Sequence, residues 1–285
     1  MQCAIQFVYP EDTHAISLSG KACSLSCDHC NKHYIEQMPT LQDEIPKNTK
    51  SFLISGGLKP DGTSFLLDRK KELTALKASG KYHFNSHVGF VDEEELEEIA
   101  KIVDFVSFDF VSDPEVIRKV YHLNRSKEEY IRLYKLLESK IQVHPHVTIG
   151  LDAGKIHWEY EAIQILHDLG AKKLVLNVLI PTAGTKFANV SNPDLKEVRK
   201  VFQYARDIFS DGMLILGCMR PAGKYRMELD MIAIEEGVDR IVQPTIKSRK
   251  FAEKMGMDIS YLYECCVMDP KKESRHTKER ELVRE

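Results

Sequence analysis

The sequence has 285 residues, of which 43% are hydrophobic and 29% are charged, and its net charge is −3. This length and composition suit one large α/β domain, and the near-neutral charge gives no reason to expect a nucleic-acid or membrane partner. We find no apolar run of membrane-spanning length and no signal peptide, so we expect a cytoplasmic protein. Seven cysteines in a reducing compartment favour metal or redox chemistry over disulfides.

Apolar runs of strand length alternate with segments of helical periodicity along the chain. The predicted strands are 14–20, 51–57, 82–90, 105–111, 142–151, 173–181, 213–221 and 240–244. The predicted helices are 31–37, 66–79, 92–103, 113–123 with 126–139, 159–170, 192–209, 226–237 and 245–256. Since the strands are apolar runs that alternate with helices, we predict an α/β fold of the (β/α)8 TIM-barrel type. The barrel domain is expected to span 1–268, and the charged residues 269–285 to form a tail.

The first predicted strand leads into the stretch LSGKACSLSCDHCNKHY, which contains Cys23, Cys27 and Cys30. In a TIM-type barrel, the loops after the strands carry the chemistry. Thiolates bind zinc or iron–sulfur clusters, and closed zinc sites and electron-carrying clusters use four protein ligands. Three cysteines therefore indicate a metal centre with one open position. A zinc loop completed by a distant ligand, or plain buried cysteines, is the alternative.

The spacing Cys23-x3-Cys27-x2-Cys30 after an opening strand resembles the signature of the radical SAM superfamily. In that superfamily three thiolates hold a [4Fe–4S] cluster whose open iron binds S-adenosylmethionine. The resemblance implies that an electron from the cluster cleaves S-adenosylmethionine, giving methionine and a 5'-deoxyadenosyl radical that abstracts hydrogen from a substrate. His29 departs slightly from the family, which usually has an aromatic residue at this place.

Two other predicted strands end in residues that the resemblance places near S-adenosylmethionine. Gly56 and Gly57 correspond to a glycine pair whose backbone meets the methionine amine, although Leu58 replaces the usual glutamate. Ser107 and Asp109 lie on one face of the fourth strand, where polar residues of the family meet the ribose. Ordinary turns, or polar residues paired with one another inside the barrel, are the alternatives.

Further candidates for cofactor contact lie on the third, fifth and sixth strands. Asn85 and His87 form a second inward pair on the third strand. The segments after the fifth and sixth strands resemble those that flank the adenine base in the superfamily. Their candidates are His146, Gly150, Asn177 and Pro181. A surface loop shaped by proline and glycine is the alternative for the sixth-strand segment.

A second set of cysteines occurs late in the chain. Cys218 ends the seventh predicted strand, and Cys265 and Cys266 follow the last predicted helix. Adjacent exposed cysteines are prone to oxidation unless something binds them. If the chain returns over the barrel mouth, the three could hold an auxiliary iron–sulfur cluster, with Arg220, Cys3 or a hydroxyl as a fourth ligand. A buried strand cysteine and an incidental pair are the alternative.

These features together resemble the biotin synthase- and lipoyl synthase-like branch, and most of all the archaeal two-protein lipoyl synthases. The resemblance implies a sulfurtransferase that inserts sulfur from an auxiliary cluster at an unactivated carbon of a protein-bound octanoyl chain. It also implies an octanoylated carrier protein as substrate, a paralogous radical SAM partner and a small electron-transfer protein. The chain lacks the second-cluster cysteines of biotin synthase and the N-terminal three-cysteine motif of bacterial lipoyl synthase.

Two rival functions stay open at this stage. A radical SAM mutase or cofactor-maturation enzyme would use the first cluster alone. A non-catalytic iron–sulfur or zinc protein would not cleave S-adenosylmethionine. Beyond the cluster ligands, the sequence indicates no catalytic residue.

Overall fold

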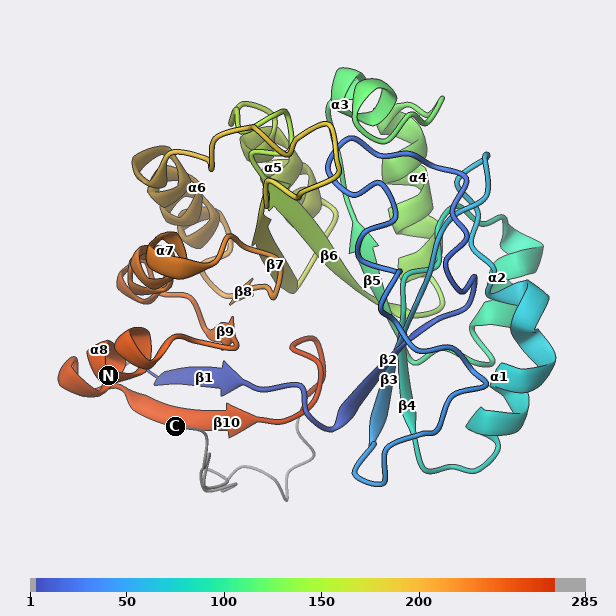
Figure 1. The fold of residues 1–285 in the computed structure, drawn as a ribbon. Helices are drawn as coiled ribbons and strands as arrows, with labels where there is room; N and C mark the ends of the chain where they lie inside the picture. Colours follow the sequence, from blue (N-terminus) through green and yellow to red (C-terminus); the bar gives the residue numbers. More distant parts are fainter. Residues whose placement is uncertain (1–3, 270–285) are drawn as a thin grey trace.

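A computed structural model describes residues 4–269, and ten strands in it form one parallel sheet. The strands are β1 (Ala4–Val8), β2 (Thr13–Ser17), β3 (Ser51–Ser55), β4 (His83–Ser86), β5 (Phe105–Asp109), β6 (Gln142–Ile149), β7 (Lys173–Val178), β8 (Met213–Leu216), β9 (Arg240–Val242) and β10 (Asp258–Leu262). Their order is β10-β1-β9-β8-β7-β6-β5-β4-β3-β2, so β10 and β2 are the edges. Figure 1 shows that the sheet curls and that the helices lie outside it.

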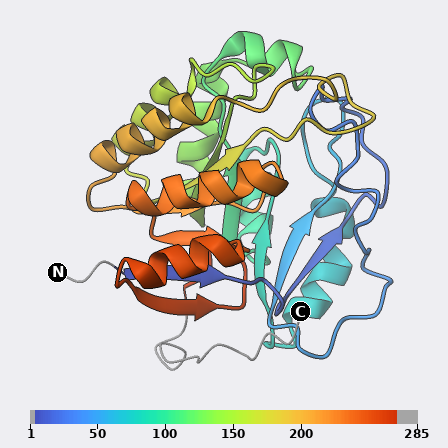
Figure 2. The same ribbon diagram turned by 60° about the vertical axis from the view of Figure 1, so that its left-hand side comes forward.

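The helices fill most of the connections between neighbouring strands. They are η1 (Leu67–Arg69), α1 (Lys70–Lys77), α2 (Glu93–Ile99), α3 (Pro114–Lys119), α4 (Lys127–Glu138), α5 (Glu159–Asp168), α6 (Leu195–Ile208), α7 (Gly223–Glu235) and α8 (Ile246–Lys254). Figure 2 shows α6, α7 and α8 side by side along one flank of the curled sheet. The fold is therefore the expected α/β arrangement of the TIM-barrel type, with an open rather than a closed sheet among the described residues.

Local sequence signals explain where several helices begin and which face they bury. Asp92 starts α2 and Ser126 starts α4, each with a glutamate three residues later that completes a capping box. In α6, the buried side chains are Val198, Val201, Phe202 and Ala205. This i, i+3, i+4, i+7 spacing gives the helix one apolar stripe toward the sheet.

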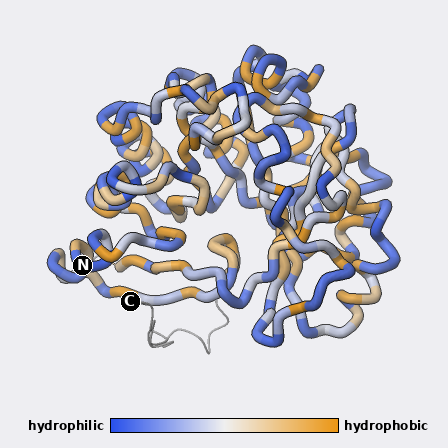
Figure 3. Tube along the Cα trace, viewed as in Figure 1, coloured by the Kyte–Doolittle hydropathy of each residue, from blue (hydrophilic) through white to orange (hydrophobic). Residues whose placement is uncertain are grey.

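Two hydrophobic clusters lie on opposite faces of the sheet. The larger cluster joins the outer face to the helices and includes Ile16, Phe52, Phe84 and Phe108. The smaller cluster fills part of the concave face with Val8, Val175, Ile215, Val242, Leu262, Cys266 and Val267. Hydropathy along the trace agrees, because the strands are mostly hydrophobic and the outer loops mostly hydrophilic (Figure 3). The inner cluster blocks part of the space that the curled sheet encloses.

Three expectations about the elements were wrong. The predicted helix 31–37 is a run of turns, because Asn31 and Lys32 adopt left-handed backbone angles (φ 42° and 69°) that an α-helix excludes. The strands β1 and β10 were missed, and they pair with each other across almost the whole chain. As a result, Cys265 and Cys266 follow a strand rather than the last helix.

Asp269, which was assigned to the charged tail, belongs to the folded domain, because its carboxylate lies 2.7 Å from the Lys173 ammonium. Residues 270–285, with the rest of the predicted tail, lie outside the described residues, as does Cys3. Within residues 4–269, no helix is both long and apolar enough to cross a membrane.

Candidate functional site

The first three cysteines lie together in the loop that follows β2. Cys27 is buried, and Cys23 and Cys30 are partly buried. Burial, together with the charges of Cys30 and Cys23, raises the pKa of Cys27 to about 12. The three thiols come from eight consecutive residues of one loop, which keeps them near one another. A thiol with such a high pKa stays protonated until a metal displaces the proton.

Neighbouring loops hold the cysteine loop at Asp28, between the second and third cysteines. The Asp28 carboxylate lies 2.8 Å from the Lys186 ammonium and 2.7 Å from His122 Nε2. Its backbone N–H donates to Val120 O, and its carbonyl accepts from Phe187 N. Four contacts at one residue therefore connect this loop to the segments after β5 and β7. Sequence reasoning missed Asp28, although its place inside the cysteine motif was a signal.

The segment after β7 packs directly against the cysteine loop. Tyr34 Oη lies 2.9 Å from Thr182 Oγ1, and Asn31 Nδ2 donates to Gly184 O at 3.1 Å. Pro181 precedes these contacts and is partly buried. The sequence placed this segment at the rim of the site, and the structure puts it beside the cysteines.

The glycine pair after β3 also meets the cysteine loop. A Cβ on Gly57 would lie 2.0 Å from Ala22 O and 2.5 Å from the Cys23 Cβ. Gly56 has φ +144°, and its nearest neighbours belong to Leu18 and Ser19. Both glycines are explained by close contact with this loop. A contact with a bound methionine group stays a prediction.

Alternation along the strands places another set of candidates on the concave face. In β5, Val106 and Phe108 pack in the outer cluster, so Ser107 and Asp109 point to the other side. Asp109 faces His146 across the β5–β6 register, and its carboxylate lies 3.6 Å from His87 Nδ1. The Asp109 side chain is 47% exposed, so solvent reaches the concave face at this level.

The Asp109 carboxylate and its histidine neighbours have linked pKa shifts. Burial lowers the pKa of His87, but hydrogen bonding and charge from Asp109 outweigh it and raise the pKa overall. Burial would raise the pKa of Asp109, but His87 outweighs it and lowers the pKa overall. Burial lowers the pKa of His146 and of His29 to about 4 each. Asp109 therefore favours a proton on His87, whereas burial favours the neutral form of His146 and His29.

Other predicted cofactor contacts have protein partners. Asn85 and Ser107 exchange hydrogen bonds of 2.9 and 3.1 Å, so these two polar residues pair with each other inside the curled sheet. Gly150 has φ +78°, and a Cβ there would lie 2.4 Å from Pro193 Cγ. The Asn177 Oδ1 atom is buried and has no hydrogen-bond partner, so it is the candidate best placed to meet a ligand.

The predicted role of Arg220 needs correction. Its side chain is fully buried, and Nε donates to Asp230 at 2.9 Å. Its other nitrogens donate to the carbonyl oxygens of Gly217, Val242 and Gln243. The guanidinium thus joins the ends of β8 and β9 to α7, and four of its five N–H donors are used within the protein.

The late cysteines approach one another inside the sheet. Cys218 is exposed, Cys265 is partly buried and Cys266 is buried. Loss of solvent around the sulfur is the largest cause that raises the pKa of Cys218, and the charge of Cys265 is the second largest. The Cys266 thiol donates a hydrogen bond to Cys265, which lowers the pKa of Cys265 and raises that of Cys266. On the concave face the charge of Cys265 thus acts on Cys218 and that of Cys218 acts on Cys266, and a shared cluster at these three thiols stays a prediction.

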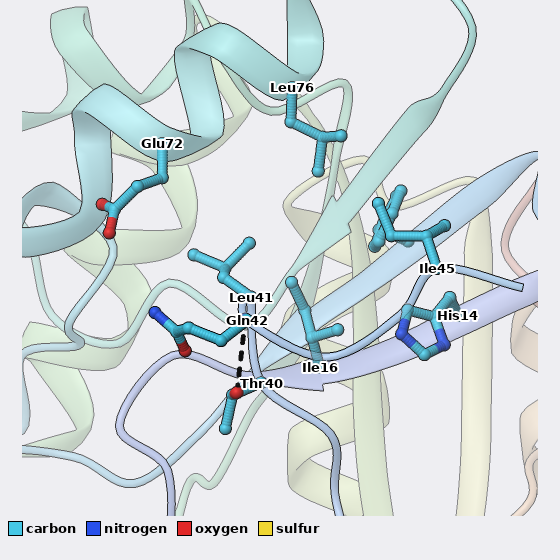
Figure 4. A pocket seen from close by; sticks show the side chains of 9 residues that line it. His14, Ile16, Thr40, Leu41, Gln42, Ile45, Glu72 and Leu76 are labelled. Atoms are coloured by element: carbon cyan, nitrogen blue, oxygen red, sulfur yellow. Dashed lines mark hydrogen bonds between the residues drawn. The ribbon is translucent and has the colours of Figure 1, made fainter.

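A well-formed cavity lies away from these groups. It has a volume of about 410 Å³ on the outer face of β2 and β3, beneath α1. Figure 4 shows that Ile16, Leu41 and Leu76 line it together with His14 and Glu72. None of the predicted site residues lies in it, so the concave face remains the candidate site.

Comparisons with solved structures support the fold. Methylornithine synthase (PylB) has a TM-score of 0.58 and 11% identity, over 90% of this chain and 84% of that chain. The hydrogenase maturase HydG from Carboxydothermus hydrogenoformans has a TM-score of 0.62 and 15% identity, over 84% of this chain and 58% of that chain. SuiB from Streptococcus suis, bound to precursor peptide SuiA, has a TM-score of 0.52 and 15% identity, over 86% of this chain and 52% of that chain.

These similarities establish the fold alone, because every identity is low. The chain spans little more than half of HydG and of SuiB. An HMG-CoA lyase, with a TM-score of 0.50 and 11% identity, also matches over 92% of this chain and 87% of that chain. The sequence matches no protein-family model and no curated protein. The function must therefore be inferred from the chemistry of the site residues.

Proposed function

We propose that this chain is a radical SAM enzyme whose first cluster is held by Cys23, Cys27 and Cys30. The observation that carries the proposal is the meeting of these three thiols in one loop after β2, next to a solvent-accessible concave face. The fold shared with PylB and HydG supports it.

The donor set is suited to an iron–sulfur cluster, because thiolates are its usual ligands and three of them leave one of four irons open. Within residues 4–269, no three His, Cys, Asp or Glu side chains are arranged around a single metal ion. When bound, such a cluster supplies the electron that cleaves S-adenosylmethionine.

The residues around the loop can bind and orient S-adenosylmethionine. The buried Asn177 Oδ1 atom offers an unused acceptor, and Asp109 offers a carboxylate that His87 keeps ionised. Loops on both sides hold the cysteine loop through Asp28. Gly56, Gly57, Ser107, His146, Gly150 and Pro181 complete the predicted surroundings, without Arg220.

The reduced protein should produce 5'-deoxyadenosine from S-adenosylmethionine. The test is anaerobic reconstitution, reduction with dithionite and chromatography of the products. The Cys23→Ala/Cys27→Ala/Cys30→Ala variant should produce none. Wild-type protein that carries about four irons at this site and still leaves S-adenosylmethionine intact would contradict the proposal.

The finer proposal is sulfur insertion into a protein-bound octanoyl chain, as in lipoyl synthesis. The charge effect of Cys265 on Cys218 and the contact between Cys265 and Cys266 support it, because three thiols in one region could hold an auxiliary cluster that supplies sulfur. Its partners would be an octanoylated carrier protein, a paralogous radical SAM subunit and a small electron-transfer protein. SuiB binds a precursor peptide, so this fold can accommodate a polypeptide substrate.

A single-cluster maturase is the second candidate, and the fold shared with HydG favours it equally. Iron and sulfide counts separate the two. About four irons that remain in the Cys23→Ala/Cys27→Ala/Cys30→Ala variant and disappear with Cys218→Ala/Cys265→Ala/Cys266→Ala would support an auxiliary cluster. No iron in the first variant would leave the single-cluster enzyme.

A further inference from the structure

The C-terminal strap, defined as residues 263–269, runs from β10 onto the concave face of the sheet. Its start bonds to the opposite edge, since Asp12 N donates to Tyr263 O and Cys265 N donates to Thr13 Oγ1. Thr13 begins β2, so the strap spans the opening between the two edge strands. Val267 is fully buried in the inner cluster.

Two cations from the starts of inner strands bind the strap backbone. Lys173, the first residue of β7, donates to Val267 O at 3.1 Å. Arg240, the first residue of β9, donates to Cys266 O at 2.6 Å and to Met268 O at 2.9 Å. Three successive carbonyl groups of the strap are therefore held by two side chains.

These two cations are almost completely buried. The side chains of Lys173 and Arg240 are only 9% and 4% exposed, and Asp269, whose carboxylate forms an ion pair with each of them, is 57% exposed. Burial lowers the pKa of both groups, and Asp269 opposes that shift. A buried cation is costly unless it is paired and hydrogen-bonded, so their positions make sense only with the strap in place.

The strap in turn fixes the late cysteines. Cys266 is buried in the inner apolar cluster, and Cys265 is partly buried against the same cluster, where it accepts a hydrogen bond from Asn85 Nδ2 at 3.4 Å. Cys218 follows β8 by two residues and does not belong to the strap. Arg240 binds the carbonyl groups of Cys266 and Met268, so this side chain fixes the backbone that carries Cys265 and Cys266.

We propose that Lys173 and Arg240 are positioning residues that hold the strap as the floor of the site, with Cys265 facing Asn85 and Cys266 turned into the apolar cluster. This inference rests on the proposed function, because it assigns the geometry of the proposed auxiliary thiols. It also makes the carboxyl ends of the strands the side from which substrate enters.

The test is peptide-level mass spectrometry of cysteine alkylation by iodoacetamide on the reduced, cluster-free full chain. Lys173→Met and Arg240→Met should each speed Cys266 alkylation about tenfold or more, since loss of a hydrogen-bonded ion frees the strap. Cys218 should react at the wild-type rate and serve as the internal reference. Lys173→Arg should restore protection, and Lys172→Met, an exposed neighbour, should leave it unchanged.

Equal Cys266 protection in wild type, Lys173→Met and Arg240→Met would overturn the inference. If the methionine variants do not fold by circular dichroism, Asp269→Asn replaces them, because it weakens both cation contacts from an exposed position. Asp269→Asn should then raise Cys266 alkylation severalfold, and an unchanged rate would overturn the inference. The assay uses no cluster and no S-adenosylmethionine, so its failure is distinguishable from failure of the proposed function.

Discussion

The cysteine loop (residues 18–34) and the C-terminal strap both bring thiols together, but different forces hold them. The loop lies at the carboxyl ends of the strands, where Asp28 and backbone bonds attach it to neighbouring loops. The strap lies against the starts of β7 and β9, where buried Lys173 and Arg240 bind its carbonyl groups. The comparison shows that backbone bonds and contacts with an exposed lysine hold the loop, whereas buried cations hold the strap.

The largest expected difference between the two regions is in S-adenosylmethionine cleavage. Cys27→Ser should reduce 5'-deoxyadenosine formation to the background level, because a serine hydroxyl is a poor ligand for cluster iron. Cys218→Ser should leave it close to wild type. The measurement is 5'-deoxyadenosine per chain under dithionite. If both variants lose cleavage equally, the two thiol sets are one site.

Gly57→Ala should destabilise the protein by about 1–3 kcal/mol and weaken iron retention, because its Cβ would meet the backbone of Ala22 and Cys23. The matched control is Gly217→Ala, whose Cβ would lie 2.1 Å from the Asn177 side chain. A side chain can move away more easily than a backbone, so this change should cost less. Urea denaturation measures the stability of each variant, and iron analysis measures iron retention. A larger loss of stability in Gly217→Ala than in Gly57→Ala would show that the backbone of the cysteine loop can move to accept the methyl group.

The strap region should make the fold sensitive to acid through His144. Burial lowers its pKa to about 3, helped by the charges of Lys173, His146 and Arg240 and opposed by Asp269. The unfolded chain takes up a proton below about pH 6.5, so stability falls as the pH drops from there toward 3. His144→Leu should flatten that fall by about 1 kcal/mol per pH unit.

Chemical denaturation between pH 7 and pH 4 measures this slope. His83→Leu is the control, because His83 is 44% exposed at the start of β4. An unchanged slope in His144→Leu would mean that other groups dominate the acid response of the strap region.

The smallest effect is expected at the rim. Lys186→Met removes one contact of Asp28, but the lysine is 67% exposed, so the free energy of unfolding should fall by less than about 1 kcal/mol. Lys173→Met should cost more because Lys173 itself is 9% exposed and binds the buried Val267 carbonyl group. Thermal melts of the two variants make the comparison. Equal losses would contradict the view that only the strap depends on dedicated cations.

Much of the architecture could be predicted because the signals are local. Apolar runs such as Lys173–Val178 are buried on both faces, and amphipathic segments such as Leu195–Ile208 bury one stripe. The cysteine spacing predicted three thiols in one loop, since residues so close in sequence cannot lie far apart. The fold class was confirmed, whereas the cofactors, the auxiliary cluster and the substrate remain proposals.

The missed features depend on distant contacts. The strand β10 (Asp258–Leu262) has a mixed pattern and is fixed by pairing with β1, about the full chain length away. Arg220 was assigned to a cofactor because its sequence position did not reveal Asp230 and the carbonyl groups around it. Lys173 and Arg240 were overlooked, although a charged residue beginning an apolar strand was a usable signal.

The pairing of β1 with β10 has a consequence for the order in which the molecule is built. Gln6 contacts Ser260, so the first strand to leave the ribosome must wait for nearly the last one. Contacts of such long sequence separation form slowly, because the loop-closure entropy is lost before they stabilise the chain. The site therefore lacks its floor until residues 263–269 have been synthesised. During that interval Cys218 and the open inner face are accessible to cellular factors that could load the site.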